Sequence, residues 1–278
     1  MNLFGFLGPK GTFSEIALKT YLKNEDVDVE CMGYASIDKL FLALDSKRCS
    51  AIIVPVENSV EGSVTTVVDH LIKLNDTFIT AEFVLKIEHN LMVKDESKSI
   101  TDIISHYQPI AQCRHYLESN YPDVDLNNAE STAKAADFVS DYNGDKVYGV
   151  IGHESLAKRY GFNIMDRNIN DSKENVTRFF IISRKPTEPT GNDKSTIVFS
   201  TMKDQSGSLA NVLNEFQSKS INLTHISSRP TKTSLGEYLF YIDCEGHFQD
   251  EILSEVLKLV EKKTSYIKCL GSYKKGGK

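Results

Sequence analysis

A polar linker divides the sequence into two stretches with different orders of predicted strands and helices. Residues 185–194 (KPTEPTGNDK) contain two prolines and a glycine but no hydrophobic residue, which is typical of an exposed connection between domains. Before the linker, short buried strands alternate with helices, whereas the order after it is strand, helix, strand, strand, helix, strand. The sequence therefore predicts a large α/β domain over residues 1–184, a ferredoxin-like βαββαβ domain over residues 195–273 and a mobile tail over residues 274–278.

The composition argues against several classes of function. The 278 residues are 40% hydrophobic with a net charge of −6, as in ordinary soluble proteins. No apolar run is long enough to span a membrane, and no basic patch of the kind that binds nucleic acid occurs. Five cysteines without a CxxC pair, and an apolar start without a basic lead-in, predict reduced thiols in a cytoplasmic protein. The seven histidines lack metal-ligand spacing, so we predict no metal site.

Three polar motifs of the first domain follow predicted strands or begin predicted helices. Residues 8–15 (GPKGTFSE) follow the strand at 3–7, and Thr12 and Glu15 have the spacing of a capping box. Residues 55–64 (PVENSVEGSV) follow a buried strand, and residues 131–136 (STAKAA) open a helix. Free N–H groups at helix starts suit an anion, although a simple turn with a good cap would have the same sequence.

A fourth motif, NVTRFF at residues 175–180, places a hydroxyl beside a guanidinium at the start of an apolar run. Residues 179–182 have the pattern of a strand buried on both faces. Thr177 offers a short hydroxyl donor, and Arg178 a flat fork that fits a carboxylate. Neighbouring side chains in a regular strand point to opposite faces, so both residues face one cleft only if the strand begins after them or bends there. A strand end with a solvated Arg is the alternative.

Taken in order, these motifs resemble those of the prephenate dehydratase family, of the monofunctional bacterial type, over essentially the full chain. The second half resembles the ACT regulatory domain through GSL at 207–209, NLT at 222–224 and SRP at 228–230. The resemblance implies a catalytic domain of two α/β lobes, similar to the type II periplasmic-binding-protein fold, with substrate in the cleft. It also implies that the ACT domain senses phenylalanine.

The implied reaction is the decarboxylating dehydration of prephenate to phenylpyruvate, CO2 and water in phenylalanine biosynthesis. Aromatisation drives it and decarboxylation supplies the electrons, so no cofactor or metal is required, but the departing hydroxide needs a proton. The resemblance implies Thr177 as the proton donor and Arg178 as a carboxylate fork. The other implied catalytic or orienting residues are Glu57, Asn58 and Ser59. The implied substrate-binding residues are Thr12, Gln112, Ser131, Thr132 and Phe179.

Phenylalanine is the implied allosteric inhibitor, bound where ACT domains pair in a homodimer or homotetramer. Its implied ligands are Gly207, Ser208, Leu209, Asn211, Asn222, Thr224, Ser228 and Arg229. Three departures from the family pattern affect this reading. The stretch SHYQP at 105–109, which contains Gln108, replaces the usual SHPQA. Ser206 and Ser227 replace the usual Pro and Glu of the regulatory motifs.

Two other functions fit the same sequence. An arogenate dehydratase differs only in accepting an amine where prephenate has a keto group, and no residue here decides between the substrates. A non-catalytic protein that senses an amino acid or another solute would bind its ligand without turnover.

Overall fold

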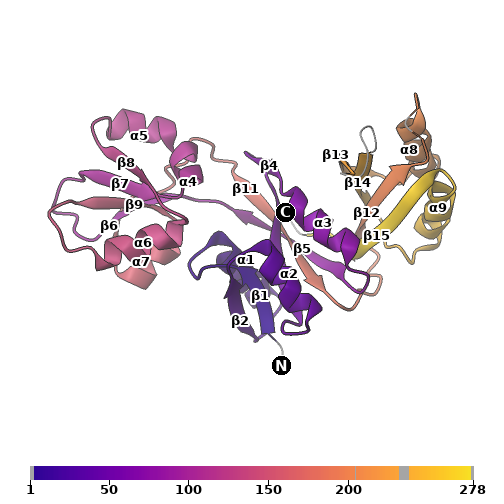
Figure 1. Cartoon of the computed structure of the whole chain (residues 1–278), viewed down its shortest axis with the longest axis horizontal. Helices are drawn as coiled ribbons and strands as arrows, with labels where there is room; N and C mark the ends of the chain where they lie inside the picture. Colours follow the sequence, from indigo (N-terminus) through magenta and orange to yellow (C-terminus); the bar gives the residue numbers. More distant parts are fainter. Residues whose placement is uncertain (1–2, 204, 232–237, 277–278) are drawn as a thin grey trace.

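The computed structural model describes residues 3–203, 205–231 and 238–276. Three units lie in a row, with a first lobe in the middle, a second lobe on one side and the C-terminal domain on the other (Figure 1). Residues 77–94 are strand-like in sequence, a long extended run that predicts a crossing between the lobes. The chain crosses into the second lobe at residues 87–89 and returns before β11. The first lobe therefore contains segments from both ends of the large domain. No helix among the described residues is long and apolar enough to cross a membrane.

The first lobe is built on one mixed sheet with the strand order β2-β1-β3-β11-β5, to which the short β4 adds beside β3. Strands β1, β2 and β3 are parallel, whereas β11 runs antiparallel to both β3 and β5. The strands are β1 (Leu3–Leu7), β2 (Glu30–Tyr34), β3 (Ala51–Asn58), β4 (Gly62–Ser63), β5 (Phe78–Lys86) and β11 (Val176–Ser183). The helices are α1 (Phe13–Asn24), α2 (Ile37–Asp45) and α3 (Thr65–Lys73).

Alternation along the central strands explains how this sheet is covered. Ile53 and Phe179 pack with α1 on one face, whereas Ile52 and Phe180 pack with α2 and α3 on the other. Residues 179–182 are buried on both faces, as predicted. The strand begins at Val176, however, so Thr177 and Arg178 lie inside it and must point to opposite faces.

The second lobe has a mixed sheet with the strand order β10-β6-β9-β7-β8. Its strands are β6 (Asn90–Val93), β7 (Asp102–Ser105), β8 (Asp125–Asn128), β9 (Tyr148–Gly152) and β10 (Asn163–Asp166). Its helices are α4 (Tyr107–Gln112), α5 (Arg114–Asn120), α6 (Thr132–Asp141) and α7 (Glu154–Tyr160). The two α/β lobes that the resemblance implied are therefore present.

The C-terminal domain has the predicted βαββαβ order and an antiparallel sheet arranged β13-β14-β12-β15. Its strands are β12 (Asp193–Thr201), β13 (Leu223–Pro230), β14 (Tyr238–Glu245) and β15 (Thr264–Lys274). Its helices, α8 (Ser208–Ser218) and α9 (Glu251–Glu261), cover one face of the sheet. The other face packs on the first lobe, where Val198, Leu270 and Tyr273 share a hydrophobic cluster with Leu71 and Phe180.

Two boundaries differ from the predictions. The strand β12 begins at Asp193, so the last two residues of the predicted linker belong to the C-terminal domain. The tail was predicted to be mobile, but Lys274 ends β15, the Lys275 N–H donates to the Asn192 carbonyl (2.9 Å) and the Gly276 N–H donates to the Glu82 carboxylate (3.1 Å). Hydrogen bonds to both domains hold residues 274–276, and residues 277–278 lie outside the described part of the chain.

Candidate functional site

A cleft of about 500 Å³ opens between the two lobes. The first lobe contributes the start of α1, the end of β3, the β4 turn and two residues of β11, Thr177 and Phe179. The second lobe contributes the starts of α4 and α6. Polar groups thus converge here from segments far apart in the sequence, on an apolar wall that includes Ile87 and Phe179. This combination is typical of a small-molecule site.

Thr177 and Asn58 form the best-defined pair in the cleft. They lie opposite each other in the β3–β11 register, so their side chains share the cleft face of the sheet. The Asn58 Nδ2 donates to the Thr177 Oγ1 at 2.9 Å. Among the described residues, no acceptor for the Thr177 hydroxyl hydrogen lies within hydrogen-bonding distance. The hydroxyl can therefore donate to a molecule in the cleft while its oxygen is held by Asn58.

The orientation of the Asn58 amide follows from its other partners. Its Oδ1 accepts from the backbone N–H groups of Val60 (2.9 Å) and Glu61 (3.1 Å), which can only donate. Its Nδ2 also donates to the backbone carbonyl of Val176 at 3.2 Å. Both ends of the amide are thus assigned, and the end facing Thr177 is the donor.

A chain of amide hydrogen bonds links this pair to the second lobe. Asn58 Nδ2 donates to Asn175 Oδ1 (2.8 Å), and Asn175 Nδ2 donates to Gln112 Oε1 on α4 (2.9 Å). Gln112 Nε2 in turn donates to the Glu61 carboxylate (3.0 Å), which also accepts from Gln108. Gln112, a predicted substrate-binding residue, therefore bridges the lobes, and Gln108 joins it at the same carboxylate.

His89 supports Gln112 from the crossing segment. Its Nε2 donates to Gln112 Oε1 at 2.9 Å, and its ring packs edge-on against Phe13 at the start of α1. Burial lowers the pKa of His89 to about 4, against a weaker opposing effect of the bond to Gln112. The imidazole is therefore neutral near pH 7, with its proton on Nε2.

The starts of α1 and α6 face each other across the cleft. Thr12 is the N-cap residue of α1, but its hydroxyl donates to the Leu7 carbonyl (2.9 Å), so the predicted capping box does not form. Glu15 accepts instead from the Gly11 N–H. Ser131 caps α6 by accepting from the Lys134 N–H (3.1 Å), and the helix starts where the STAKAA motif predicts it. The described lining contains no Lys or Arg, so these helix N-termini are the sites of positive potential in the cleft.

Comparison with known proteins agrees with this geometry. The family profile "PDT: Prephenate dehydratase" matches residues 4–187, and the profile "ACT domain" matches residues 195–260. The chain belongs to the prephenate dehydratase family. It is similar to "Prephenate dehydratase" of Methanocaldococcus jannaschii, at 42% identity over 95% of both chains. It is also similar to "Bifunctional chorismate mutase/prephenate dehydratase" of Aquifex aeolicus, at 38% identity over 97% of this chain and 73% of that protein.

A solved structure supports the same assignment. The crystal structure of prephenate dehydratase in complex with L-Phe from Arthrobacter aurescens superposes with a TM-score of 0.87 at 30% identity, covering 98% of this chain and 90% of that one. The dehydratase domain of this chain therefore comprises the two lobes, and the C-terminal domain is an ACT domain.

Arg178 does not face the dehydratase cleft, contrary to the predicted role as a carboxylate fork. Its side chain points to the opposite face of β11, where Nη1 donates to Asp243 of the ACT domain (2.6 Å), Nη2 to the Tyr273 hydroxyl (2.9 Å) and Nε to Glu82 (2.9 Å). Burial opposes the charge, but the interactions with Tyr273, Asp243, Tyr241 and Glu82 raise the pKa of Arg178 above its usual value. The prediction is wrong because β11 already begins at Val176, so Thr177 and Arg178 lie inside the strand and point to opposite faces.

The remaining predicted cleft residues divide into two groups. Glu57, Thr132 and Phe179 line the cleft beside Thr177 and Ser131. Ser59 lies outside the lining, where its hydroxyl donates to the Glu174 carbonyl (3.1 Å) and accepts from the Val176 N–H (3.0 Å). Ser59 thus ties the end of β3 to the start of β11.

The predicted phenylalanine ligands do not converge within one chain. Gly207, Ser208 and Leu209 line a hollow of about 560 Å³ beside α8. Asn222 lines another hollow near Glu245, whereas Thr224 and Asn211 line neither. Ser228 and Arg229 line a cavity against the dehydratase domain, where Arg229 pairs with Asp69 of α3. Within this chain the first two groups therefore line separate hollows.

Several residues of the site were not predicted. Glu61 lies inside the PVENSVEGSV motif and Asn175 begins the NVTRFF motif, so these motifs could have indicated both residues. His89 and His106 also line the cleft; His106 lies in the SHYQP stretch at 105–109, whereas no motif marks His89. No group of three or more His, Cys, Asp or Glu side chains suited to a metal ion occurs among the described residues.

Proposed function

We propose that this chain catalyses the decarboxylating dehydration of prephenate to phenylpyruvate, with Thr177 as the donor to the departing hydroxyl. Membership of the prephenate dehydratase family supports the reaction. One observation carries the role of Thr177: its oxygen accepts from Asn58 at 2.9 Å on the cleft face of β11, which leaves its hydrogen for a ligand.

The chemistry needs a donor at the ring hydroxyl and little else from the protein. As the carboxylate on the ring leaves as CO2, its electron pair moves into the ring and the C–O bond to the hydroxyl breaks on the far side. A Thr hydroxyl is a weak acid, and the hydrogen bond that it accepts from Asn58 makes it a better donor. The departing oxygen thereby leaves as water or as a strongly hydrogen-bonded hydroxide.

The two substrate carboxylates require positive potential in a cleft that is also lined by Glu57, Glu61 and Glu130. We assign this role to the N-termini of α1 and α6, whose first N–H groups have no intrahelical partner. The hydroxyls of Ser131 and Thr132 lie at the start of α6 and add donors, whereas the Thr12 hydroxyl already donates to the Leu7 carbonyl (2.9 Å). Arg178 takes no part in this binding, and Glu57 orients its neighbours.

Phenylalanine regulation is proposed to occur between paired ACT domains. The strand β13 lies at the edge of its sheet, because among the described residues it pairs with β14 alone. Ile226 on β13 is 48% exposed. Pairing at this edge would bring Asn222, Thr224 and Ser228 of one chain towards the hollow beside Gly207 of another. Chain pairing and phenylalanine binding should therefore be lost together in Ile226→Glu, but kept in Leu126→Glu, which alters a residue of similar exposure (49%) on β8 of the second lobe.

The direct test is turnover by the pure protein, with prephenate and arogenate offered separately and phenylpyruvate and phenylalanine assayed. We expect Thr177→Ala to lower kcat by about 10²–10⁴ with a smaller change in KM, because the interaction matters mainly in the transition state. Thr177→Ser keeps the donor and should lose much less. Preference for arogenate would change the substrate assignment, and full kcat in Thr177→Ala would remove Thr177 from the mechanism.

A further inference from the structure

The ACT domain lies directly behind the pair that faces the cleft. In the β3–β11 register Thr177 lies opposite Asn58, and Arg178 lies opposite Glu57. Side chains alternate along a strand, so the first pair faces the cleft and Arg178 faces the ACT domain, while Glu57 lines both the cleft and the cavity against the ACT domain. Each cleft residue is thus adjacent in sequence to a residue that the ACT domain contacts.

The contact behind Thr177 is buried and closely bonded. The Arg178 Nη1 lies 2.6 Å from Asp243 Oδ2, and its Nη2 lies 2.9 Å from the Tyr273 hydroxyl, with both partners 0% exposed. The Asp243 Oδ1 also accepts from Thr196 at 2.7 Å, and the Tyr273 hydroxyl lies 2.9 Å from the same Thr196 oxygen. Strands β12, β14 and β15 therefore hold the guanidinium in one orientation.

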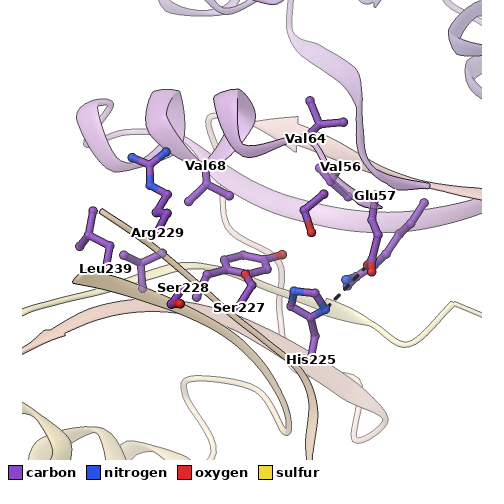
Figure 2. A pocket seen from close by; sticks show the side chains of 13 residues that line it. Val56, Glu57, Val64, Val68, His225, Ser227, Ser228, Arg229 and Leu239 are labelled. Atoms are coloured by element: carbon purple, nitrogen blue, oxygen red, sulfur yellow. Dashed lines mark ion pairs between the residues drawn. The ribbon is translucent and has the colours of Figure 1, made fainter. Parts of the chain in front are cut away.

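The contact behind Asn58 is looser. His225 Nδ1 on β13 lies 3.8 Å from the Glu57 carboxylate, across a cavity of about 180 Å³ between the two domains. Figure 2 shows Glu57 and His225 reaching towards each other from opposite sides of this space. Of the two contacts, only the one at Arg178 has the distances and burial of a rigid support.

We propose that Asp243 and Tyr273 of the ACT domain are positioning residues for Thr177, acting through Arg178. A planar guanidinium bonded on three sides cannot rotate, so it fixes the backbone of Arg178 and with it the adjacent Thr177. Reaction rates are sensitive to displacements of about 1 Å in a catalytic group. The inference rests on the proposed role of Thr177 as donor. It makes the ACT domain part of the support of the active site as well as its regulator.

The test compares kcat and KM in three variants of the full chain. Asp243→Asn removes the charge behind Thr177 and should lower kcat by about 10–100-fold with KM changed by less than about 3-fold. Tyr273→Phe keeps the packing, removes one bond to Arg178 and should lower kcat by about 3–10-fold. Lys268→Met is the control: Lys268 also crosses between the domains, donating to the Leu71 and Leu74 carbonyls (both 2.7 Å), and its ammonium forms no hydrogen bond with the described residues of β3 or β11. Its kcat should stay within about 2-fold of the wild type.

A second measurement identifies Thr177 as the residue that these variants affect. In a Thr177→Ala background, Tyr273→Phe should cause no further loss of kcat, because the donor that it positions is gone. The proposal would be overturned if Tyr273→Phe lowered kcat by the same factor in the Thr177→Ala background as in the wild type. It would also be overturned if Lys268→Met lowered kcat as much as Asp243→Asn does. If Asp243→Asn fails to fold, Tyr273→Phe still provides the test. Full kcat in Thr177→Ala itself would instead contradict the proposed function.

Discussion

The first lobe has two boundaries, and they differ in what crosses them. The boundary with the second lobe is a cleft bridged by polar side chains, among them Glu61 and Gln112. The boundary with the ACT domain is a continuation of the first lobe's own core, in which Tyr273 packs against Phe180 at a ring distance of 5.6 Å. Water can replace the bonds of the first boundary, but it cannot replace the packing of the second.

The ACT boundary also involves close backbone approach. A Cβ atom placed on Gly271 of β15 would collide with the backbone carbonyl of Ile79 on β5, so only glycine fits there. Lys268 of the same strand donates to three carbonyls at the end of α3, which lack helical partners. The ACT sheet thus completes structural features of the first lobe.

This difference indicates which boundary can move. The second lobe is attached through two chain crossings and a set of hydrogen bonds, and the described residues form no hydrophobic cluster shared by the two lobes. Opening and closing of the cleft should therefore cost less than separating the ACT domain. The ACT domain shares a core with the first lobe and should move with it as one body. We therefore expect signals from the ACT domain to reach the cleft through β3 and β11, without separation of the domains.

The largest expected effect is the loss of the whole ACT boundary. The polar linker alone predicts that residues 1–184 fold without the ACT domain, whereas the shared core predicts that they do not. Each buried side chain contributes about 1.5–3 kcal/mol, and the loss of Val198, Leu270 and Tyr273 alone approaches the ~5–15 kcal/mol stability of a whole domain. The fragment should melt without cooperativity in circular dichroism. A cooperative melt with near-normal turnover would show that the boundary is dispensable.

A single methyl group should test the close approach at the ACT boundary. Gly271→Ala adds a Cβ that meets the Ile79 backbone, and we expect a loss of about 3 kcal/mol or more in the free energy of unfolding. Gly191→Ala is the matched control, because Gly191 also has a positive φ (+80°) but no atom lies within 4 Å of the added Cβ. It should lose only about 1 kcal/mol from backbone strain. Equal urea midpoints for the two variants would contradict the close approach.

Much of this architecture could be predicted because it depends on local patterns. The buried run at residues 179–182 predicts its strand, and the extended pattern around residues 87–89 predicts the crossing between the lobes. Ser131 caps α6 as its type and position indicate. The family resemblance supplied the reaction and placed Thr177 at the centre of the candidate site.

The rest could not be predicted because it depends on contacts distant in sequence. The direction of Arg178 follows from whether β11 begins before or after it, and boundaries of that kind are set by pairing with β3 and β5. Its partners Asp243 and Tyr273 lie 65 and 95 residues away in the chain. The burial of His89, which decides its charge, likewise comes from segments that the local sequence does not identify.

Acid pH should lower the free energy of unfolding through His89, which lies at the boundary between the two lobes. Because burial lowers its folded pKa to about 4 from 6.5, its contribution to stability is complete above pH 6.5 and is lost as the pH falls towards 4. Linkage gives a loss of about 2 kcal/mol at pH 5 relative to pH 7.5. His89→Gln should reduce this pH dependence when urea midpoints are measured at both values. An unchanged pH dependence in that variant would mean that His89 does not titrate in this way.

The smallest expected effect concerns the bridge between the lobes. Glu61 is exposed on the first lobe and accepts from Gln112 (3.0 Å) and Gln108 on the second, so Glu61→Gln weakens the only carboxylate bridge described across the cleft. Exposed polar contacts contribute little to folding, and we expect the free energy of unfolding to change by less than about 1 kcal/mol. The effect should appear in the motion of the lobes, as faster exchange of amide hydrogens at the start of α4 with no change in β15. Matched exchange in β15 is the internal control, because the ACT boundary is untouched. A loss of stability as large as that of Gly271→Ala would mean that the cleft is held as firmly as the ACT boundary, and the contrast between the two would not stand.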